Sequence, residues 1–147
     1  MSSDAPGADP SLRHAFERAR DADAGAAELA CYRARLATEG PTLVAMCGIG
    51  RLLVPLAAGG AALHGVDGSA AAIAVAQARL AERQCDALLV RQALDELNLA
   101  FRYHAAFLPD AALNRIDDPT RALEGLRRVA AHLVAPASLV VDLAVPA

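Results

Sequence analysis

The chain of 147 residues has the length of one ordinary domain, and 55% of its residues are apolar, which is ample for a packed core. The net charge is −3 and the basic residues are scattered, so neither nucleic acid nor an anionic membrane surface is expected as a partner. No apolar run is long enough to span a bilayer, and no signal peptide is recognisable. The chain is therefore expected to be neither membrane-embedded nor exported.

The three cysteines support the same expectation. Cys31, Cys47 and Cys85 are odd in number, form no CxxC pair and have no histidine at metal-ligand spacing. We therefore expect reduced thiols, a cytoplasmic location and no metal site.

The N-terminal third of the chain is predicted to be a tail followed by helices. Residues 1–10 are small, acidic and rich in Pro and Gly, which predicts a disordered tail ahead of a single domain over residues 11–147. Two helices are predicted next, of which the second is capped by Asp21 or Asp23 and ended by Gly40.

From the proline after that glycine onward, short apolar runs alternate with helical patterns. Five strands are predicted in the segments "PTLVAMC", "AALHGVD", "CDALLVRQA", "FRYHAAFLP" and "ASLVVDLAV". Helices are predicted between them; one ends at Gly59 or Gly60, and another begins where Asp118 precedes Pro119. This alternation predicts an α/β fold: an open, parallel, five-stranded sheet with helices on both faces.

Ligands of such sheets bind beyond the carboxyl ends of the strands, where the strand order reverses. Gly48 and Gly50 follow the first predicted strand and allow a ligand to approach the backbone closely. Asp67 ends the second strand, where a carboxylate can accept both hydroxyls of a ribose. The glycine spacing is not that of a dinucleotide fingerprint, because Leu53 stands where a third glycine is needed.

In order and spacing, several segments resemble the class I S-adenosylmethionine-dependent methyltransferase family over nearly the whole chain. They are "ELACYRARLATEGPTLVAMCGIGRLLVPLAAGG", "GVDGSAAAIAVAQARL", "RYHAAFLPDAALNRI" and "DDPTRALEGLRRVAAHLVAPASLVVDLAVP". The resemblance implies a Rossmann-like sheet in the order 3-2-1-4-5 and S-adenosylmethionine as cofactor. It places the cofactor against the ends of the first four strands, at Cys47, Gly48, Gly50, Asp67, Gly68, Ala93, Leu94 and Leu108.

This chain also departs from the family pattern. Val44 and Met46 replace the acidic residue and the first glycine of the first-strand motif, and Ala93 replaces the acidic residue that contacts the adenine. His104 stands where the fourth strand has an aspartate, and the sequence stops at Ala147, before the final antiparallel pair of strands. Weakened or lost cofactor binding is therefore one possible outcome.

Several side chains also allow a purely structural interpretation. The glycine turn can serve packing alone, and Asp67 can cap the following helix. Asp110 and Asn114 fit a turn, and Asp142 lies in an apolar run and needs a polar partner. Others are not expected to be catalytic: Tyr32 is assigned to the core, Cys47 to a backbone role, and His64, His104 and His132 to positions away from the site.

Two functions follow from these observations. The first is methyl transfer to an unidentified small-molecule acceptor, with catalytic residues unassigned. The alternative is a catalytically inactive, methyltransferase-like subunit that stabilises a partner. In either case the fifth strand, expected over residues 138–145, has no Lys and no internal Pro and leaves an open edge. A homodimer or a partner chain is expected to cover that edge.

Overall fold

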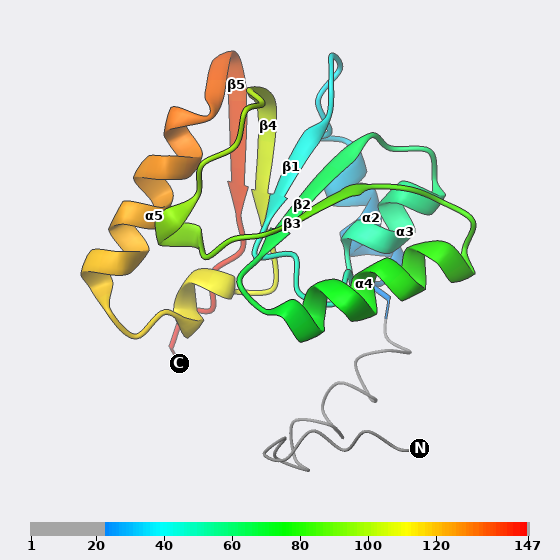
Figure 1. The fold of residues 1–147 in the computed structure, drawn as a ribbon. Helices are drawn as coiled ribbons and strands as arrows, with labels where there is room; N and C mark the ends of the chain where they lie inside the picture. Colours follow the sequence, from blue (N-terminus) through cyan, green and yellow to red (C-terminus); the bar gives the residue numbers. More distant parts are fainter. Residues whose placement is uncertain (1–22, 147) are drawn as a thin grey trace, which may run out of the picture.

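The computed structural model describes residues 23–146, and its core is one parallel sheet of five strands in the order β3-β2-β1-β4-β5 (Figure 1). The strands are β1 (Thr42–Ala45), β2 (Leu63–Asp67), β3 (Leu88–Arg91), β4 (Tyr103–Leu108) and β5 (Leu133–Val141). Every pairing between neighbours is parallel. The predicted fold class and strand order are therefore confirmed.

Helices cover both faces of this sheet, as predicted. Figure 1 shows α2, α3 and α4 on one side and α5 on the other. The α-helices are α2 (Ala26–Arg33), α3 (Leu53–Ala58), α4 (Ala70–Glu82) and α5 (Pro119–Ala131). Two short 3₁₀ helices, η1 (Leu94–Glu96) and η2 (Ala112–Arg115), follow β3 and β4.

Each face of the sheet has its own core, and β1 contributes to both. Val44 packs with residues of α2, α3 and α4, whereas Leu43 and Ala45 pack with residues of η1, β4 and α5. All three side chains are completely buried. The alternation arises because successive side chains of a strand point to opposite faces. Burial among apolar side chains also explains why a valine is well accommodated at position 44.

Two predicted helix boundaries are confirmed, and both predicted ends of the helix before β1, at Asp21 or Asp23 and at Gly40, are wrong. Gly59 follows α3 as its C-cap, and Asp118 caps α5 by accepting a hydrogen bond from the Thr120 amide at 2.9 Å. The second predicted helix is shorter than expected, because α2 is preceded by Gly25 and ends at Arg33. Asp23 does not cap it, since its carboxylate pairs with two arginines of the α4 region.

The fifth strand also differs from the prediction. It begins at Leu133 and ends at Val141, so it starts and stops earlier than residues 138–145. Tyr103 pairs with Leu133 and Ala105 with Ser138, which is a register shift along the β4–β5 pair. Within the described chain, β5 pairs only with β4, so its second edge is open (Figure 1).

The predicted tail over residues 1–10 and the first predicted helix lie outside the described residues. Among residues 23–146, no helix has the length and apolar character that are needed to cross a membrane.

Candidate functional site

A tight loop follows β1 at the carboxyl end of the sheet. Gly48 and Gly50 have φ angles of +56° and +86°, the left-handed region that favours glycine. A Cβ atom at Gly50 would lie 2.6 Å from Cγ2 of Val54, so a side chain does not fit there. A Cβ atom at Gly48 would have no neighbour within 4 Å, so this residue faces open space. The two glycines therefore serve different purposes: one allows close packing and the other leaves room above the loop.

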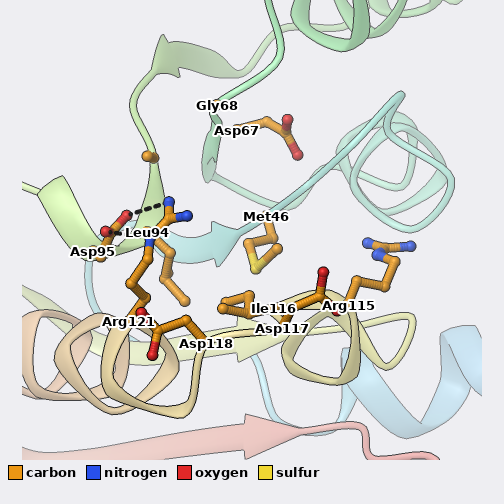
Figure 2. A pocket seen from close by; sticks show the side chains of 11 residues that line it. Met46, Asp67, Gly68, Leu94, Asp95, Arg115, Ile116, Asp117, Asp118 and Arg121 are labelled. Carbon is orange, nitrogen blue, oxygen red and sulfur yellow. Dashed lines mark hydrogen bonds and ion pairs between the residues drawn. The ribbon is translucent and has the colours of Figure 1, made fainter.

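Met46 precedes these glycines and shares their backbone conformation. Its φ angle is +51°, which costs an L-residue with a side chain about 1–2 kcal/mol. Its side chain packs partly against the core on the α5 face, and it also lines the crevice at the strand ends. In Figure 2 it lies between Asp67 and Ile116. The loop has thus kept the conformation of a glycine at this position while placing a flexible thioether in the crevice.

Asp67, at the end of β2, holds the loop in place. Its Oδ2 accepts a hydrogen bond from the Gly48 amide at 2.9 Å, and its Oδ1 accepts one from the Ser69 amide at 2.9 Å. The helix cap of α4 is Ser69, whose hydroxyl accepts from the Ala72 amide at 3.2 Å. Asp67 is therefore not the helix cap. Each of its oxygens still has a lone pair available for a ligand hydroxyl.

A buried arginine supports the same loop from the α4 side. Arg79 is 4% exposed, donates to the Ile49 carbonyl at 3.0 Å and pairs with Asp23 at 2.6 Å. The Ala24 amide donates to the Arg51 carbonyl at 3.0 Å. Sequence reasoning missed Arg79, although its helical spacing from the buried Ala76 places it on the inner face of α4.

A cavity of about 400 Å³ opens beside this loop at the carboxyl end of the sheet, within the size range of small-molecule sites. Of the eight predicted site residues, Asp67, Gly68, Ala93 and Leu94 line it. The other four, Cys47, Gly48, Gly50 and Leu108, do not line the cavity. Further lining residues that were not in the predicted set are Met46, Asp95, Arg115, Ile116, Asp117, Asp118 and Arg121. Most of these follow β4, whose carboxyl end meets the same crevice.

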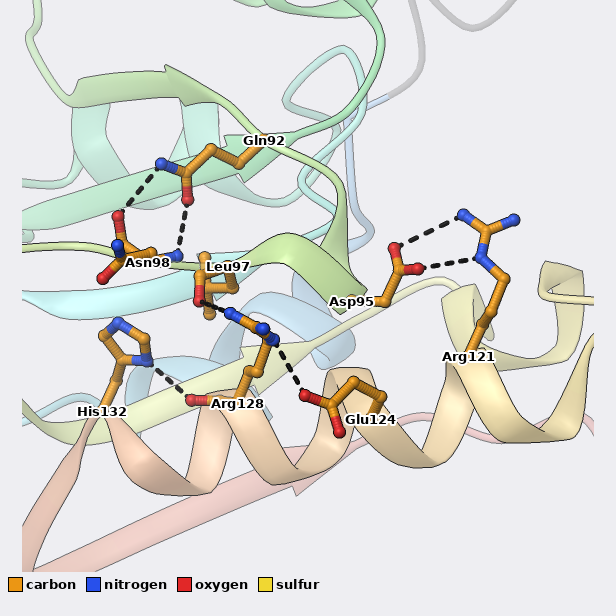
Figure 3. A network of polar contacts seen from close by, with 8 residues as sticks. All are labelled: Gln92, Asp95, Leu97, Asn98, Arg121, Glu124, Arg128 and His132. Atoms are coloured by element: carbon orange, nitrogen blue, oxygen red, sulfur yellow. Dashed lines mark hydrogen bonds and ion pairs between the residues drawn. The ribbon is translucent and has the colours of Figure 1, made fainter.

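The wall of the cavity formed by η1 is fixed to α5. Figure 3 shows Asp95 paired with Arg121, with Nε at 2.9 Å from Oδ2, and Arg128 donating to the Leu97 carbonyl at 3.1 Å. The Arg121 guanidinium keeps the pKa of Asp95 below its usual range. Gly125 allows the close approach, because a Cβ atom there would lie 2.6 Å from the Leu94 side chain.

Charges around the cavity are mixed. Asp95 and Arg121 neutralise each other, whereas the side chain of Arg115 has no ion pair within residues 23–146. This arginine lies on the cavity wall beside Asp117 (Figure 2). No group of His, Cys, Asp and Glu residues among those described is able to hold a metal ion.

The Cys47 thiol is unsuited to nucleophilic catalysis. It is 4% exposed, and burial together with the nearby Asp67 carboxylate raises its pKa to about 12. A thiol with this pKa remains protonated near neutral pH.

The three histidines that the structure describes make contacts of their own. His64 contacts the Tyr103 hydroxyl at 3.0 Å, and His104 lies 3.0 Å from the Pro136 carbonyl. His132 accepts from the Leu99 amide at 2.9 Å, which joins the end of α5 to the chain after η1.

A second group of polar side chains gathers beside the end of the glycine loop. Arg51 bridges Glu28 at 2.7 Å and Asp110 at 3.0 Å. Asp110 lies in a turn with a φ angle of +61°, in line with its predicted turn role. Asp142 accepts from the Ala111 amide at 3.2 Å, and it is exposed rather than buried, because β5 has already ended.

Two further predicted roles have outcomes in the structure. Asn114 exchanges two hydrogen bonds with the backbone of Ala144, each of 3.0 Å, and so ties the chain after β5 to η2. Tyr32 is 6% exposed and meets the Phe107 ring edge-on at 4.8 Å, so its assignment to the core is confirmed.

Comparisons with known proteins agree with this geometry. A family model described as a methyltransferase domain matches residues 43–132. A comparison with curated protein sequences gives no match.

Solved structures that are similar to this chain include three methyltransferases. An S-adenosylmethionine-dependent methyltransferase from Clostridium acetobutylicum is 18% identical with a TM-score of 0.72, covering 91% of this chain and 56% of its own. The amino pentose methyltransferase CalS10 from Micromonospora echinaspora, bound to S-adenosylmethionine, is 20% identical with a TM-score of 0.73, covering 97% and 59%. The glycopeptide N-methyltransferase MtfA, complexed with S-adenosylmethionine, is 24% identical with a TM-score of 0.72, covering 82% and 54%. The chain therefore spans between half and three fifths of the length of these enzymes.

Proposed function

Since the chain belongs to the class I S-adenosylmethionine-dependent methyltransferase family, we propose that it binds S-adenosylmethionine in the crevice at the carboxyl end of the sheet and transfers a methyl group to a small-molecule acceptor. The observation that carries the proposal is the contact between Asp67 and the Gly48 amide. It places a carboxylate with free lone pairs directly beside a glycine loop that has open space above it. We also propose that residues 11–147 act as one domain.

The residues present fit this cofactor. Asp67 and Gly68 would hold the ribose, Ala93 and Leu94 would flank the adenine, and the glycine loop over residues 47–50 would face the amino-acid end. Leu108 would contribute beneath them at the end of β4. When bound, S-adenosylmethionine supplies an activated methyl group on its sulfonium. The chain's own contribution is alignment in a crevice that excludes water, which needs no nucleophile from the protein.

The proposed acceptor class follows from two facts. The cavity has the size of a small-molecule site. Two of the similar structures are described as methyltransferases of an amino pentose and a glycopeptide. Because the chain spans little more than half of their length, we propose the acceptor class only as a small molecule.

One observation favours the alternative function, an inactive subunit. The Met46 side chain lines the crevice and is partly buried, so it competes for space with a ligand that packs against the glycine loop. Giving up its partial burial costs about 1–2 kcal/mol, which is about a tenfold loss of affinity.

Calorimetric titration with S-adenosylmethionine and S-adenosylhomocysteine tests both readings. We expect parent protein to bind with measurable heat and Met46→Gly to bind about tenfold more tightly. Met46→Leu, which keeps the bulk of the side chain, should match the parent within about twofold. If neither the parent nor Met46→Gly binds at millimolar concentration, the proposal of a methyltransferase fails and the inactive subunit is favoured.

We further propose that the open edge of β5 is covered by a second copy or by a partner chain, and that the protein is cytoplasmic. Leu139 in this strand is 37% exposed, and an uncovered strand edge is a site for further strand pairing. Leu139→Lys should lower the mass seen in sedimentation at high concentration, whereas Leu123→Lys on α5, with 48% exposure in the parent, should not. A parent protein that sediments as a monomer would contradict self-association.

A further inference from the structure

One wall of the proposed cofactor crevice has little secondary structure of its own. Residues 92–99, here called the η1 segment, leave the edge strand β3 and contain only the three-residue helix η1. Three consecutive residues of this segment line the crevice: Ala93, Leu94 and Asp95. The Gln92 side chain closes the segment on itself, since it donates to the Asn98 carbonyl at 3.1 Å and accepts from the Asn98 amide at 2.9 Å. The place of the whole segment therefore depends on contacts with its neighbours.

One face of α5 supplies these contacts. The residues that meet the η1 segment are Arg121, Gly125, Arg128 and His132, here called the α5 stripe. Intervals of four, three and four residues bring side chains to the same face of a helix. Figure 3 shows Arg121, Arg128 and His132 following one another along α5, beside the η1 segment. The spacing in the sequence thus directs one face of α5 at the wall of the crevice.

Two of the four contacts of the α5 stripe restrain the segment only weakly. The pair between Asp95 and Arg121 lies at the surface, with 60% of the Arg121 side chain exposed, so water screens it. Leu94 packs where Gly125 leaves room for it, and it is 6% exposed. This apolar contact is stabilising but non-directional, so it does not by itself fix the orientation of the segment.

Arg128 and His132 provide the directional contacts. Arg128 donates to the Leu97 carbonyl at 3.1 Å. The His132 ring accepts from the Leu99 amide at Nε2, at 2.9 Å, and its Nδ1 lies 2.6 Å from the Arg128 carbonyl. An amide can only donate and a carbonyl can only accept, so the ring must be neutral with its proton on Nδ1. His132 is 6% exposed, so water does not readily replace a lost bond to the Leu99 amide.

We propose that Arg128 and His132 are positioning residues of the cofactor site. They hold the η1 segment at the distance from Asp67 that suits a bound nucleoside, and so strengthen its binding without touching it. This inference rests on the proposed function. It gives α5 a part in the site beyond covering one face of the sheet.

Calorimetric titration of the full chain with S-adenosylhomocysteine tests the inference. Arg128→Met, which keeps the aliphatic stem, and His132→Leu should each weaken binding about threefold to tenfold, because the wall loses a hydrogen bond that places it. His132→Gln should restore the affinity to within about twofold of the parent, since its Oε1 can accept from the Leu99 amide without a ring. A merely structural role predicts lower stability but unchanged affinity of the folded protein.

Each variant has a matched control. Arg127→Met changes an exposed arginine of α5 outside the stripe, which has no hydrogen bond or ion pair within residues 23–146. His64→Leu removes the 3.0 Å contact of a histidine with the Tyr103 hydroxyl, near the start of β2 and at the opposite end of the sheet from the crevice. Both controls should bind like the parent. Dispersed amide spectra establish that all variants are folded.

Equal affinity of Arg128→Met and Arg127→Met, or of His132→Leu and His64→Leu, would overturn the inference. A His132→Gln protein that binds as weakly as His132→Leu would also overturn it. With a parent protein that binds, these results leave the proposed function standing. A parent protein that binds no S-adenosylhomocysteine overturns the proposed function, and this inference with it.

Discussion

Replacement of Asp67 is expected to destabilise the protein even without any ligand. The carboxylate accepts one partly buried hydrogen bond from the Gly48 amide and one exposed bond from the Ser69 amide, both of 2.9 Å. Hydrogen bonds to a charged group contribute about 1.5–3 kcal/mol each, and the exposed bond contributes less because water replaces it. Asp67→Ala should therefore lower the free energy of unfolding by about 2 kcal/mol, equivalent to roughly 4–8 °C in melting temperature.

Asp67→Asn refines this prediction, because the amide keeps one acceptor oxygen of nearly the same shape. It should retain the bond to Gly48 in a neutral, weaker form and lose the bond to Ser69, which gives a loss of about 1 kcal/mol. Urea unfolding of the parent, both variants and Asp86→Ala provides the measurement. Asp86 is an exposed carboxylate with no partner in the described chain, so its removal should change the stability by less than about 0.5 kcal/mol.

An Asp67→Ala protein as stable as Asp86→Ala would refute the assignment of Asp67 as a restraint on the glycine loop. The result also decides how a binding experiment is interpreted. If Asp67→Ala loosens the loop, its loss of nucleoside binding has two causes, the missing ribose contact and the altered loop. Asp67→Asn, with a smaller effect on the loop, is then the more informative variant for the cofactor.

Two further predictions concern packing and pH. Gly125→Ala should lower the free energy of unfolding, measured with urea, by about 1–3 kcal/mol, because its Cβ atom would lie 2.6 Å from the Leu94 side chain. This loss is expected despite the better helix propensity of alanine. An unchanged free energy of unfolding would show that η1 moves easily to make room. Stability should also fall as the pH rises above about 9, since burial raises the pKa of Cys47 and of Tyr103 to about 12 and their protons are lost first in the unfolded chain. The chain has 14 arginines and no lysine, so no lysine side chain titrates in this window. Each buried group contributes up to about 1.4 kcal/mol per pH unit. Unfolding midpoints at pH 8, 9 and 10 measure how steeply stability falls with pH. Cys47→Ala should make this fall less steep. Stability that does not change over this range would show that these groups are accessible to solvent.

The parts of the fold that follow from local pattern were predictable from the sequence. Apolar runs of strand length and the helix signals at Asp118 and Gly59 concern residues close together in the chain, and the structure confirms them. The strand order followed from the family resemblance rather than from the pattern itself. Right-handed crossovers then leave few ways to wind such a sheet.

Contacts between distant residues were not predictable in the same way. Asp23 looks like a helix cap in the sequence, but its carboxylate forms a salt bridge with Arg79, which is 56 residues away in the chain. The cavity wall after β4 was only partly predicted, because Arg115 and Arg121 lie on helical segments whose position depends on how η1 packs against α5. The end of β5 was misplaced, since the strand stops where its partner β4 ends and not where β-propensity ends.

The main chain of the loop after β1 is held at several points by residues outside the loop. Neighbouring groups bind the Cys47 and Gly48 amides and the Ile49 and Arg51 carbonyls. Main-chain atoms are the same whatever side chain a residue carries, so mutational drift in this loop can alter ligand chemistry without altering its shape. Met46 illustrates this arrangement, because its φ angle is +51° while its side chain lines the crevice. For protein engineering, position 46 is thus a place where a new side chain can be introduced into the crevice, whereas the side chains of Cys47 and Ile49 are buried and constrained by packing.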